Sequence, residues 1–309
     1  MNSPAHAIEV AALEKRYGPT PAVDGITFSI AAGEVFGLLG PNGAGKTTTV
    51  EILEGYRRAD AGEVRVLGVD PWRDGDTLRP RIGVMLQEGG LYPGVKPLEA
   101  LQLFASYYDD PDDPERLLQL VGLDDSRQTL VRRMSGGQQQ RLSLALALVG
   151  KPSLVFLDEP TAGMDPHARA TTWAMIRELR DRGVTVVLTT HAMNEAEQLC
   201  DRVGIIDHGR LVACDSPNEL TTRAAADETT FSTITGLAVD ALAVRLGLAV
   251  GTVRELRPGD YLVETAATPE MVAAVTAWLC EQGALVSELR AGRRSLEDVF
   301  LRLTGEGRG

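Results

Sequence analysis

The sequence predicts an α/β protein that ends in a small α+β unit. Over the first 225 residues, apolar runs typical of buried strands alternate with helical patterns, which indicates a parallel sheet with crossover helices. A glycine-rich loop also lies between the apolar run 35–39 and a helical pattern that begins at Lys46. A strand, such a loop and a helix, in this order, are typical of an α/β domain that binds phosphates.

The first elements in chain order are expected to be antiparallel strands. Residues 8–13 and 26–30 have strand patterns, and Gly18 and Pro19 form a turn signal between them. After the glycine-rich loop, residues 82–87 are typical of a buried strand. The next block, about 91–149, has helical spacing and is interpreted as a helical subdomain inserted into the α/β domain.

Strand patterns recur further along the chain, at 153–157, 184–189, 203–207 and 210–213. Between the first two, Asp165 is expected to cap a helix with Pro166 at its first position, and Gly183 ends it. His208 and Gly209 join the last two strands in hairpin fashion. The first domain is therefore expected to span residues 1–225.

A small accessory domain is expected over residues 226–309. Strand patterns at 250–256 and 261–265 are followed by a helix that Thr268 opens and Gly283 closes. A capping-box helix starts at Ser295, and its apolar stripe is more often core than partner surface. These patterns indicate an α+β unit, ferredoxin-like in arrangement, although the block 224–251 carries no usable signature.

Charge and hydropathy exclude several classes of protein. The net charge of -12 and the pI near 4.9 argue against a nucleic-acid partner, since neutralising phosphates requires a basic face. No apolar run approaches the roughly 20 residues that a membrane-spanning helix needs. The N-terminal residues lack the basic and apolar regions of a signal peptide. We therefore expect a cytoplasmic protein.

The glycine-rich loop has the pattern G-x-x-x-x-G-K-[ST] between Gly40 and Thr47. In such loops, backbone N–H groups surround the phosphates, the lysine reaches the outer phosphates and the hydroxyl binds Mg²⁺. The sequence therefore predicts a nucleoside triphosphate site. The residues expected to form it are Gly40, Pro41, Asn42, Gly43, Ala44, Gly45, Lys46, Thr47 and Thr48.

A second anion site is predicted at Ser135, Gly136, Gly137 and Gln138, which stand before an apolar helical pattern. Bare backbone amides at a helix N-terminus bind anions. Such a run is usually an ordinary loop, but its position ahead of the strand 153–157 favours a functional role.

Two carboxylates, Asp158 and Glu159, follow that buried strand, at the sheet edge where α/β proteins bind ligands. Asp158 is expected to hold Mg²⁺, and Glu159 to polarise an attacking water. His191, at the end of the next strand, is expected to donate to the γ-phosphate; the alternative is a structural histidine. Tyr17 is expected to stack on adenine, with a surface tyrosine as the alternative.

These motifs resemble the nucleotide-binding subunit of an ABC transporter over residues 8 to about 220. The resemblance implies a P-loop ABC ATPase domain, with a mixed sheet core and a helical subdomain, that uses ATP and Mg²⁺. It also implies a head-to-tail dimer, in which each ATP lies between one copy's glycine-rich loop and the other copy's Ser-Gly-Gly-Gln. The residues that carry the resemblance are 40–48, Gln87, 135–138, 158–160, Asp165 and His191.

The resemblance also implies individual roles. It assigns Gln87 to catalysis, Mg²⁺ sensing and coupling to a permease, and Asp165 to communication between the two nucleotide sites. The expected metal ligands are then Thr47, Gln87 and Asp158. Met134 and Met164 replace leucines common in the family, apolar changes of similar volume that cores tolerate.

Residues 87–93 and 296–301 resemble a narrower group, the daunorubicin-resistance type of multidrug and antibiotic exporter ATPases. This resemblance implies an ATPase that works with a separate transmembrane permease, on the inner face of the cell membrane, to export a drug, antibiotic or other hydrophobic compound. The alternative is a soluble ABC ATPase that acts on ribosomes or DNA. A non-hydrolysing ATP-dependent clamp is a third hypothesis, against which Glu159 and His191 argue.

Overall fold

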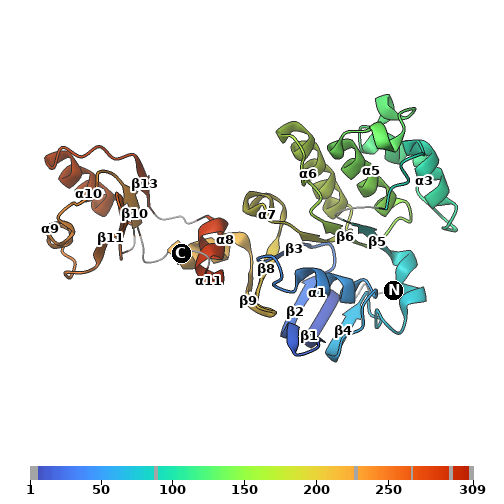
Figure 1. The fold of residues 1–309 in the computed structure, drawn as a ribbon, viewed down its shortest axis with the longest axis horizontal. Coiled ribbons are helices and arrows are strands. Elements are labelled where there is room, and N and C mark those ends of the chain that lie inside the picture. Colours follow the sequence, from blue (N-terminus) through green and yellow to red (C-terminus); the bar gives the residue numbers. More distant parts are fainter. Residues whose placement is uncertain (1–5, 87–89, 226–228, 266, 292–294, 306–309) are drawn as a thin grey trace. The chain divides into compact units, whose positions relative to one another are not determined.

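The computed structural model describes residues 6–86, 90–225, 229–265, 267–291 and 295–305. The chain forms two compact units, Met1–Ser216 and Pro217–Gly309 (Figure 1). The division falls before helix α8 (Pro217–Ala225), whereas the expected boundary at residue 225 lies after this helix. The reason is that α8 packs against α11 (Leu296–Thr304) of the second unit.

The first unit contains a mixed six-stranded sheet, as the fold class predicted. Its strands run parallel except the last, β9, which is antiparallel to β8. Strands β3 and β7 are buried along their whole length, which explains their continuous apolar runs. The strands in spatial order are β5 (Ile82–Met85), β6 (Leu154–Asp158), β7 (Thr185–Thr189), β3 (Val35–Leu39), β8 (Arg202–Asp207) and β9 (Arg210–Asp215).

A second, antiparallel sheet consists of β1 (His6–Tyr17), flanked by β2 (Thr20–Ala31) and β4 (Ala61–Val66). Its buried face shares a hydrophobic core with β3 and with helix α1 (Lys46–Leu53). In this core the rings of Phe28 and Phe36 stack with centroids 5.5 Å apart. The packing joins the sheet to the two elements that flank the glycine-rich loop.

Helices cover the rest of the first unit. Helices α3, α4 and α5 pack on one another within the block 91–149, and α6 and α7 follow β6 and β7 (Figure 1). Asp165 caps α6 as expected, because its carboxylate accepts hydrogen bonds from the amides of His167 and Ala168. The helices are α2 (Gly75–Leu78), α3 (Pro97–Ala105), α4 (Pro114–Leu120), α5 (Gly136–Leu148), α6 (Pro166–Asp181) and α7 (Met193–Leu199), with short 3₁₀ turns at Arg79–Arg81, Asp124–Ser126 and Val131–Arg133.

The second unit has the order β-α-β-β-α-β and the antiparallel strand arrangement β11-β12-β10-β13. This is the ferredoxin-like arrangement. Its core includes Trp278 and the stacked rings of Phe231 and Tyr261, whose centroids are 5.1 Å apart. The elements are β10 (Thr229–Ser232), α9 (Val239–Arg245), β11 (Val253–Arg257), β12 (Asp260–Val263), α10 (Pro269–Glu281) and β13 (Glu288–Arg290).

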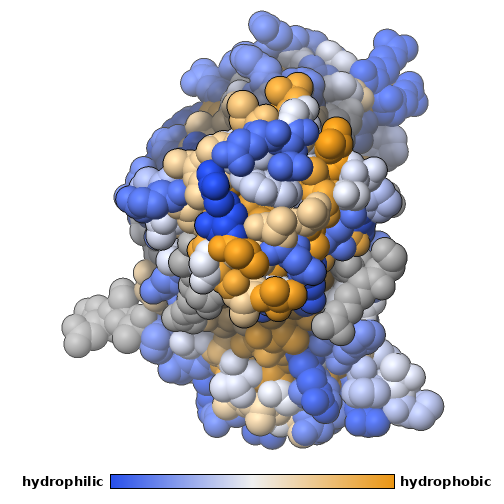
Figure 2. Space-filling view, turned by 90° about the vertical axis from the view of Figure 1, so that its left-hand side faces the viewer, coloured by the Kyte–Doolittle hydropathy of each residue, from blue (hydrophilic) through white to orange (hydrophobic). Residues whose placement is uncertain are grey.

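Hydrophobic and hydrophilic residues are interspersed on the face that Figure 2 turns to the viewer. The exposed apolar residues of the second unit include Ile234, Val244, Val250 and Leu285. Scattered exposed apolar residues of this kind are normal for folded proteins. Among the helices in the described part of the chain, none combines the length and the apolar character needed to span a bilayer.

Candidate functional site

Two glycines allow the loop between β3 and α1 to pack against neighbouring backbone. A Cβ at Gly45, which has φ of +109°, would lie 2.2 Å from the carbonyl oxygen of Ala22 on β2. A Cβ at Gly40 would lie 2.3 Å from the carbonyl oxygen of Ile206 on β8. Only glycine permits these approaches, so the loop is held between β2 and β8.

The turn between β8 and β9 supports the same loop. The Gly209 amide donates to the carbonyl of Ala44, at 2.9 Å, and the Gly209 carbonyl accepts from the Asp24 amide, at 2.8 Å. His208 and Gly209 both have positive φ, as tight hairpin turns require. The sequence identified this turn from its residue types, but it gave no signal that the turn contacts the loop.

Lys46 starts α1 and is 9% exposed. Its Nζ donates to the carbonyl oxygens of Gly40, at 2.7 Å, and Pro41, at 3.0 Å. Burial lowers the pKa of Lys46, while the charges of Glu159 and Asp158 act in the opposite direction. The ammonium therefore lies over the loop, near both carboxylates, and its hydrogen bonds within the described residues go to carbonyls that an anion could replace.

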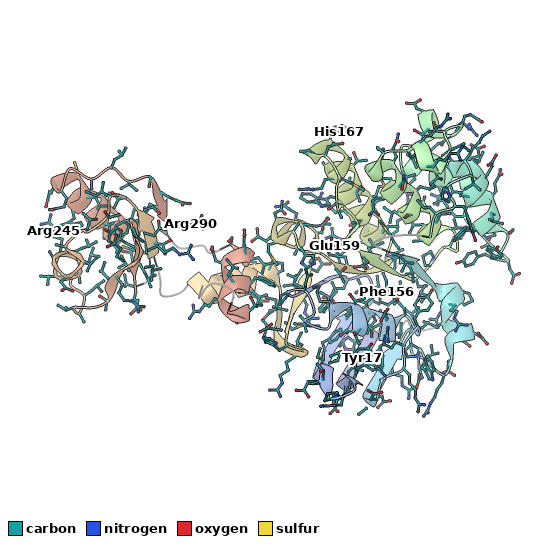
Figure 3. The ribbon with its side chains drawn as sticks, viewed as in Figure 1. Tyr17, Phe156, Glu159, His167, Arg245 and Arg290 are labelled. Carbon is teal, nitrogen blue, oxygen red and sulfur yellow. The ribbon has the colours of Figure 1, made fainter. Side chains whose placement is uncertain are left out.

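Asp158 is the last residue of β6, and its carboxylate accepts a hydrogen bond from the Thr189 hydroxyl at the end of β7. Glu159, labelled in Figure 3, follows directly. Its amide donates to the Thr189 carbonyl at 3.1 Å. The Glu159 Oε1 lies 3.0 Å from Nε2 of His191. The ends of two adjacent parallel strands thus bring both carboxylates and the histidine together.

These groups line one open cavity of about 510 Å³ beside the glycine-rich loop. It brings together nine of the predicted residues with Ala22 and Thr189. The lining residues are Ala22, Asn42, Gly43, Gly45, Lys46, Thr47, Thr48, Asp158, Glu159, Thr189 and His191. A larger cavity of about 640 Å³, lined mainly by residues 57–65 and 70–73, contains none of the predicted site residues.

The cavity suits Mg²⁺ as well as phosphate. Thr47 offers a hydroxyl and Asp158 a carboxylate, which are the hard oxygen ligands that Mg²⁺ prefers. Mg²⁺ commonly uses one or two carboxylates and completes its shell with water and substrate phosphates. Two oxygen-bearing side chains beside a phosphate loop therefore fit this ion. Gln87, the other predicted ligand, lies outside the described residues.

The predicted second anion site does not line this cavity. Ser135 caps α5: its hydroxyl accepts from the Gln138 amide, at 3.3 Å, and its own amide donates to the Gln138 side chain, at 2.9 Å. A Cβ at Gly136 would meet open space, so a ligand can approach this helix end. Asp165 likewise lines no part of the cavity.

Tyr17 also lies outside the residues that line the cavity, and it is 45% exposed. The Arg57 guanidinium carbon lies 5.3 Å from the Tyr17 ring centroid, and Lys15 Nζ lies 6.0 Å from it. Arg57 is held in turn by Glu51, with Nε 2.6 Å from the carboxylate. The ring therefore has cationic neighbours in the structure.

Sequence reasoning also missed a buried acid near the site. Glu54, which follows α1, is 6% exposed. Burial raises the pKa of Glu54 to about 8, and the charges of Asp158 and Glu51 add to this effect. Nothing in the sequence distinguishes this glutamate from Glu51, because its burial comes from tertiary packing.

The ABC transporter family model matches residues 23–162. The chain is 39% identical to the Nod factor export ATP-binding protein I of Ralstonia nicotianae, over 96% of this chain and 94% of that protein. It is 37% identical to the daunorubicin/doxorubicin resistance ATP-binding protein DrrA of Streptomyces peucetius, over 98% of this chain and 93% of that protein.

Two solved structures share the fold of the first unit. One is an ATP-binding subunit of an ABC transporter, with 27% identity, a TM-score of 0.64, and coverage of 69% of this chain and 91% of that one. The other is cbiO1 of Clostridium perfringens, described as part of the ABC transporter complex cbiONQ. It has 28% identity, a TM-score of 0.64, and coverage of 70% and 91%.

Proposed function

The chain belongs to the ABC transporter family as an ATP-binding, ATP-hydrolysing subunit, and we propose that it energises a separate membrane permease for export. The observation that carries this proposal is the single cavity that joins the phosphate loop to Asp158, Glu159 and His191. Such a combination of loop, carboxylates and histidine supplies the parts that phosphoryl transfer to water requires.

Substrate binding uses the loop and the start of α1. Backbone amides at this helix N-terminus face the phosphates of ATP, and the helix dipole favours their charge. Lys46 Nζ, now bonded to two carbonyls, turns toward the outer phosphates. Thr47, Asp158 and Gln87 would hold Mg²⁺, and the ion would neutralise charge on the phosphate oxygens. Tyr17 stacks on adenine in this proposal.

Hydrolysis uses the ends of β6 and β7. Glu159 accepts the proton of the attacking water as general base. His191 Nε2 lies 3.0 Å from Glu159 Oε1 and orients this carboxylate. With ATP in the cavity, the imidazole N–H of His191 turns to donate to the γ-phosphate. Both side chains keep access to the cavity, with 20% of the Glu159 side chain and 46% of the His191 side chain exposed.

The separation of the two anion sites supports a dimer. The α5 N-terminus has open space beside Gly136 but does not line the loop cavity of its own copy. We therefore assign it to the ATP held by a second copy, in a head-to-tail arrangement. Asp165, which caps α6 shortly after Glu159, connects the two nucleotide sites in the proposed dimer.

The export direction rests on relatives that match nearly the whole chain and are named for Nod factor export and for daunorubicin resistance. We propose a drug, an antibiotic or another hydrophobic compound as the cargo. A separate permease would bind the protein at the inner face of the membrane. The alternative, action on ribosomes or DNA, is not favoured by these relatives, and the net charge of -12 argues against a nucleic-acid partner.

A complementation experiment tests the shared site. Lys46→Ala damages the loop, and Ser135→Arg blocks the second anion site, so each variant alone has two defective composite sites. In a mixed dimer, one site joins the intact loop of one copy to the intact Ser-Gly-Gly-Gln of the other. We expect each variant to be nearly inactive in ATP hydrolysis and the mixture to regain activity.

A mixture as inactive as its components would contradict the head-to-tail site. Lys46→Ala mixed with Lys46→Ala/Ser135→Arg is the matched control, because this mixed dimer contains no intact composite site. Recovery of the protein from membranes only when a permease is co-expressed would test the transport role separately.

A further inference from the structure

A buried carboxylate, Glu195, lies on α7 shortly after His191. It is 1% exposed and lines no part of the cavity. Its Oε1 accepts hydrogen bonds from the Thr161 hydroxyl, at 2.7 Å, and from the Trp173 indole Nε1, at 2.9 Å. Burial of a carboxylate is costly unless such donors satisfy it, so these two bonds fix its position.

The two donors come from the elements that carry the proposed chemistry. Thr161 is 4% exposed and stands two residues after Glu159, in the segment that leads to Asp165. Trp173 is on α6, the helix that Asp165 caps. One oxygen atom of Glu195 therefore connects the segment after β6, the helix α6 and the helix α7.

The segment after β6 and the segment from the end of β7 to α7 also meet at the cavity itself. Glu159 bonds to the Thr189 carbonyl through its amide and approaches His191 through its carboxylate. The Thr161–Glu195 bond is a further and fully buried link between them. Glu159 has φ of +49°, a conformation that costs free energy and persists only where the surroundings hold it.

We propose that Glu195 is a positioning residue for ATP hydrolysis, which holds Thr161 and thereby sets the orientation of Glu159. This inference rests on the proposed role of Glu159 as general base. Glu195 acts without touching the substrate: it anchors the segment 159–161 to α6 and α7. A displacement of about 1 Å at a reacting group can reduce turnover by up to about a hundredfold.

The test compares Glu195→Leu with Glu195→Gln in the full chain. Because both donors bond to one oxygen, the amide oxygen of glutamine can accept both bonds. We expect Glu195→Gln to keep kcat within about threefold of the parental value, and Glu195→Leu to lower kcat by about 10- to 100-fold. The KM for ATP should stay within about twofold in both, because the loop is untouched.

Thr161→Val removes the other half of the bond and keeps the side-chain shape. We expect it to lower kcat by about tenfold, and the Thr161→Val/Glu195→Leu double variant to be no slower than Glu195→Leu alone. Thr172→Val is the matched control: this buried threonine donates to the Ala168 carbonyl in its own helix and to the Met164 sulfur, and not to Glu195.

Three results would overturn the inference. The first is a Glu195→Gln variant as slow as Glu195→Leu. The second is a loss of ATP binding and melting temperature in Glu195→Leu that matches its loss of kcat. The third is a Glu195→Leu substitution that lowers kcat by the same factor when Glu159 is already Gln, which would show that Glu195 does not act through Glu159. A Glu159→Gln variant with parental turnover would instead refute the general base, and with it the basis of this inference.

Discussion

Lys46 and Glu159 line the same cavity, and the surroundings of each side chain support its proposed role. Lys46 is buried over the loop, where a compact ammonium fits and a planar guanidinium would not. Glu159 keeps part of its side chain exposed to the cavity, beside His191. The lysine is therefore assigned to binding and the glutamate to turnover.

Glu159→Gln should slow ATP hydrolysis by about a hundredfold or more, because the amide cannot accept the proton of the attacking water. ATP binding should persist, so the variant should form a stable ATP-bound dimer that size-exclusion chromatography detects. Glu63→Gln, at an exposed carboxylate on β4, is the control. Hydrolysis at the parental rate would remove Glu159 from its role.

Lys46→Ala should weaken ATP binding by about 10- to 100-fold, since charge-assisted hydrogen bonds to phosphate are lost. A fluorescent ATP analogue titrated into the protein measures the affinity. Lys96→Ala removes a lysine near the start of α3 that does not line the cavity and serves as the control. Unchanged affinity in Lys46→Ala would contradict the assignment of the loop.

At the scale of elements, helix α1 joins the phosphate loop at one end to the buried Glu54 at the other. The pKa of Glu54 is about 8 in the folded protein and near 4.5 without burial, so the folded state binds the extra proton. Stability should therefore fall as pH rises from about 4.5 through 8, and level off above that.

Glu54→Gln should remove this dependence and raise the free energy of unfolding at pH 8.5 by about 5 kcal/mol relative to the parent. The measurement is urea unfolding of both proteins at several pH values between 5 and 8.5. The difference between the two should be small at pH 5 and grow with pH. A difference that does not change with pH would contradict the raised pKa.

The loop glycines differ in what surrounds them. Gly45→Ala places a Cβ against the Ala22 carbonyl and should destabilise the first unit by about 3 kcal/mol or more. Gly43→Ala is the control within the same loop: it also has positive φ, but its Cβ meets open space. It should cost about 1 kcal/mol. Equal destabilisation in chemical unfolding would mean that the packing against β2 does not matter.

The buried strands β3, β6 and β7 could be predicted from the sequence, because continuous apolar runs are a local signal. Strand β1 extends to Tyr17, beyond the expected end at residue 13, since its polar second half is held by pairing with β2. Strand β10 and helix α9 had no signature. They are short, and their apolar residues are recognisable only through packing in the shared core of the second unit.

At the scale of the whole molecule, the motif residues could be predicted from the sequence. The residues that hold them in place through tertiary contacts could not. The glycine-rich loop, Asp158, Glu159 and His191 form recognisable local patterns, and the structure places them in one cavity. Ala22, Gly209 and Glu195 support them through contacts between residues far apart in the chain. Such contacts depend on the fold, and their residue types occur equally often in ordinary positions.

The proposed head-to-tail dimer makes activity depend on protein concentration. In dilute solution the ATPase rate should rise with about the square of the protein concentration, because two copies must meet to form a site. The measurement is a dilution series of the parental protein at saturating ATP. A rate proportional to concentration, with a monomer throughout in size-exclusion chromatography, would mean that the copies do not pair without a further chain.

The left-handed backbone at Glu159 has a consequence for protein engineering. Glycine or asparagine adopts this conformation at lower cost than glutamate, so Glu159→Gly or Glu159→Asn relieves roughly 1 kcal/mol of strain. A library screened for heat resistance alone would therefore enrich inactive proteins at this position. Any stabilised form of this ATPase has to be selected for turnover at the same time.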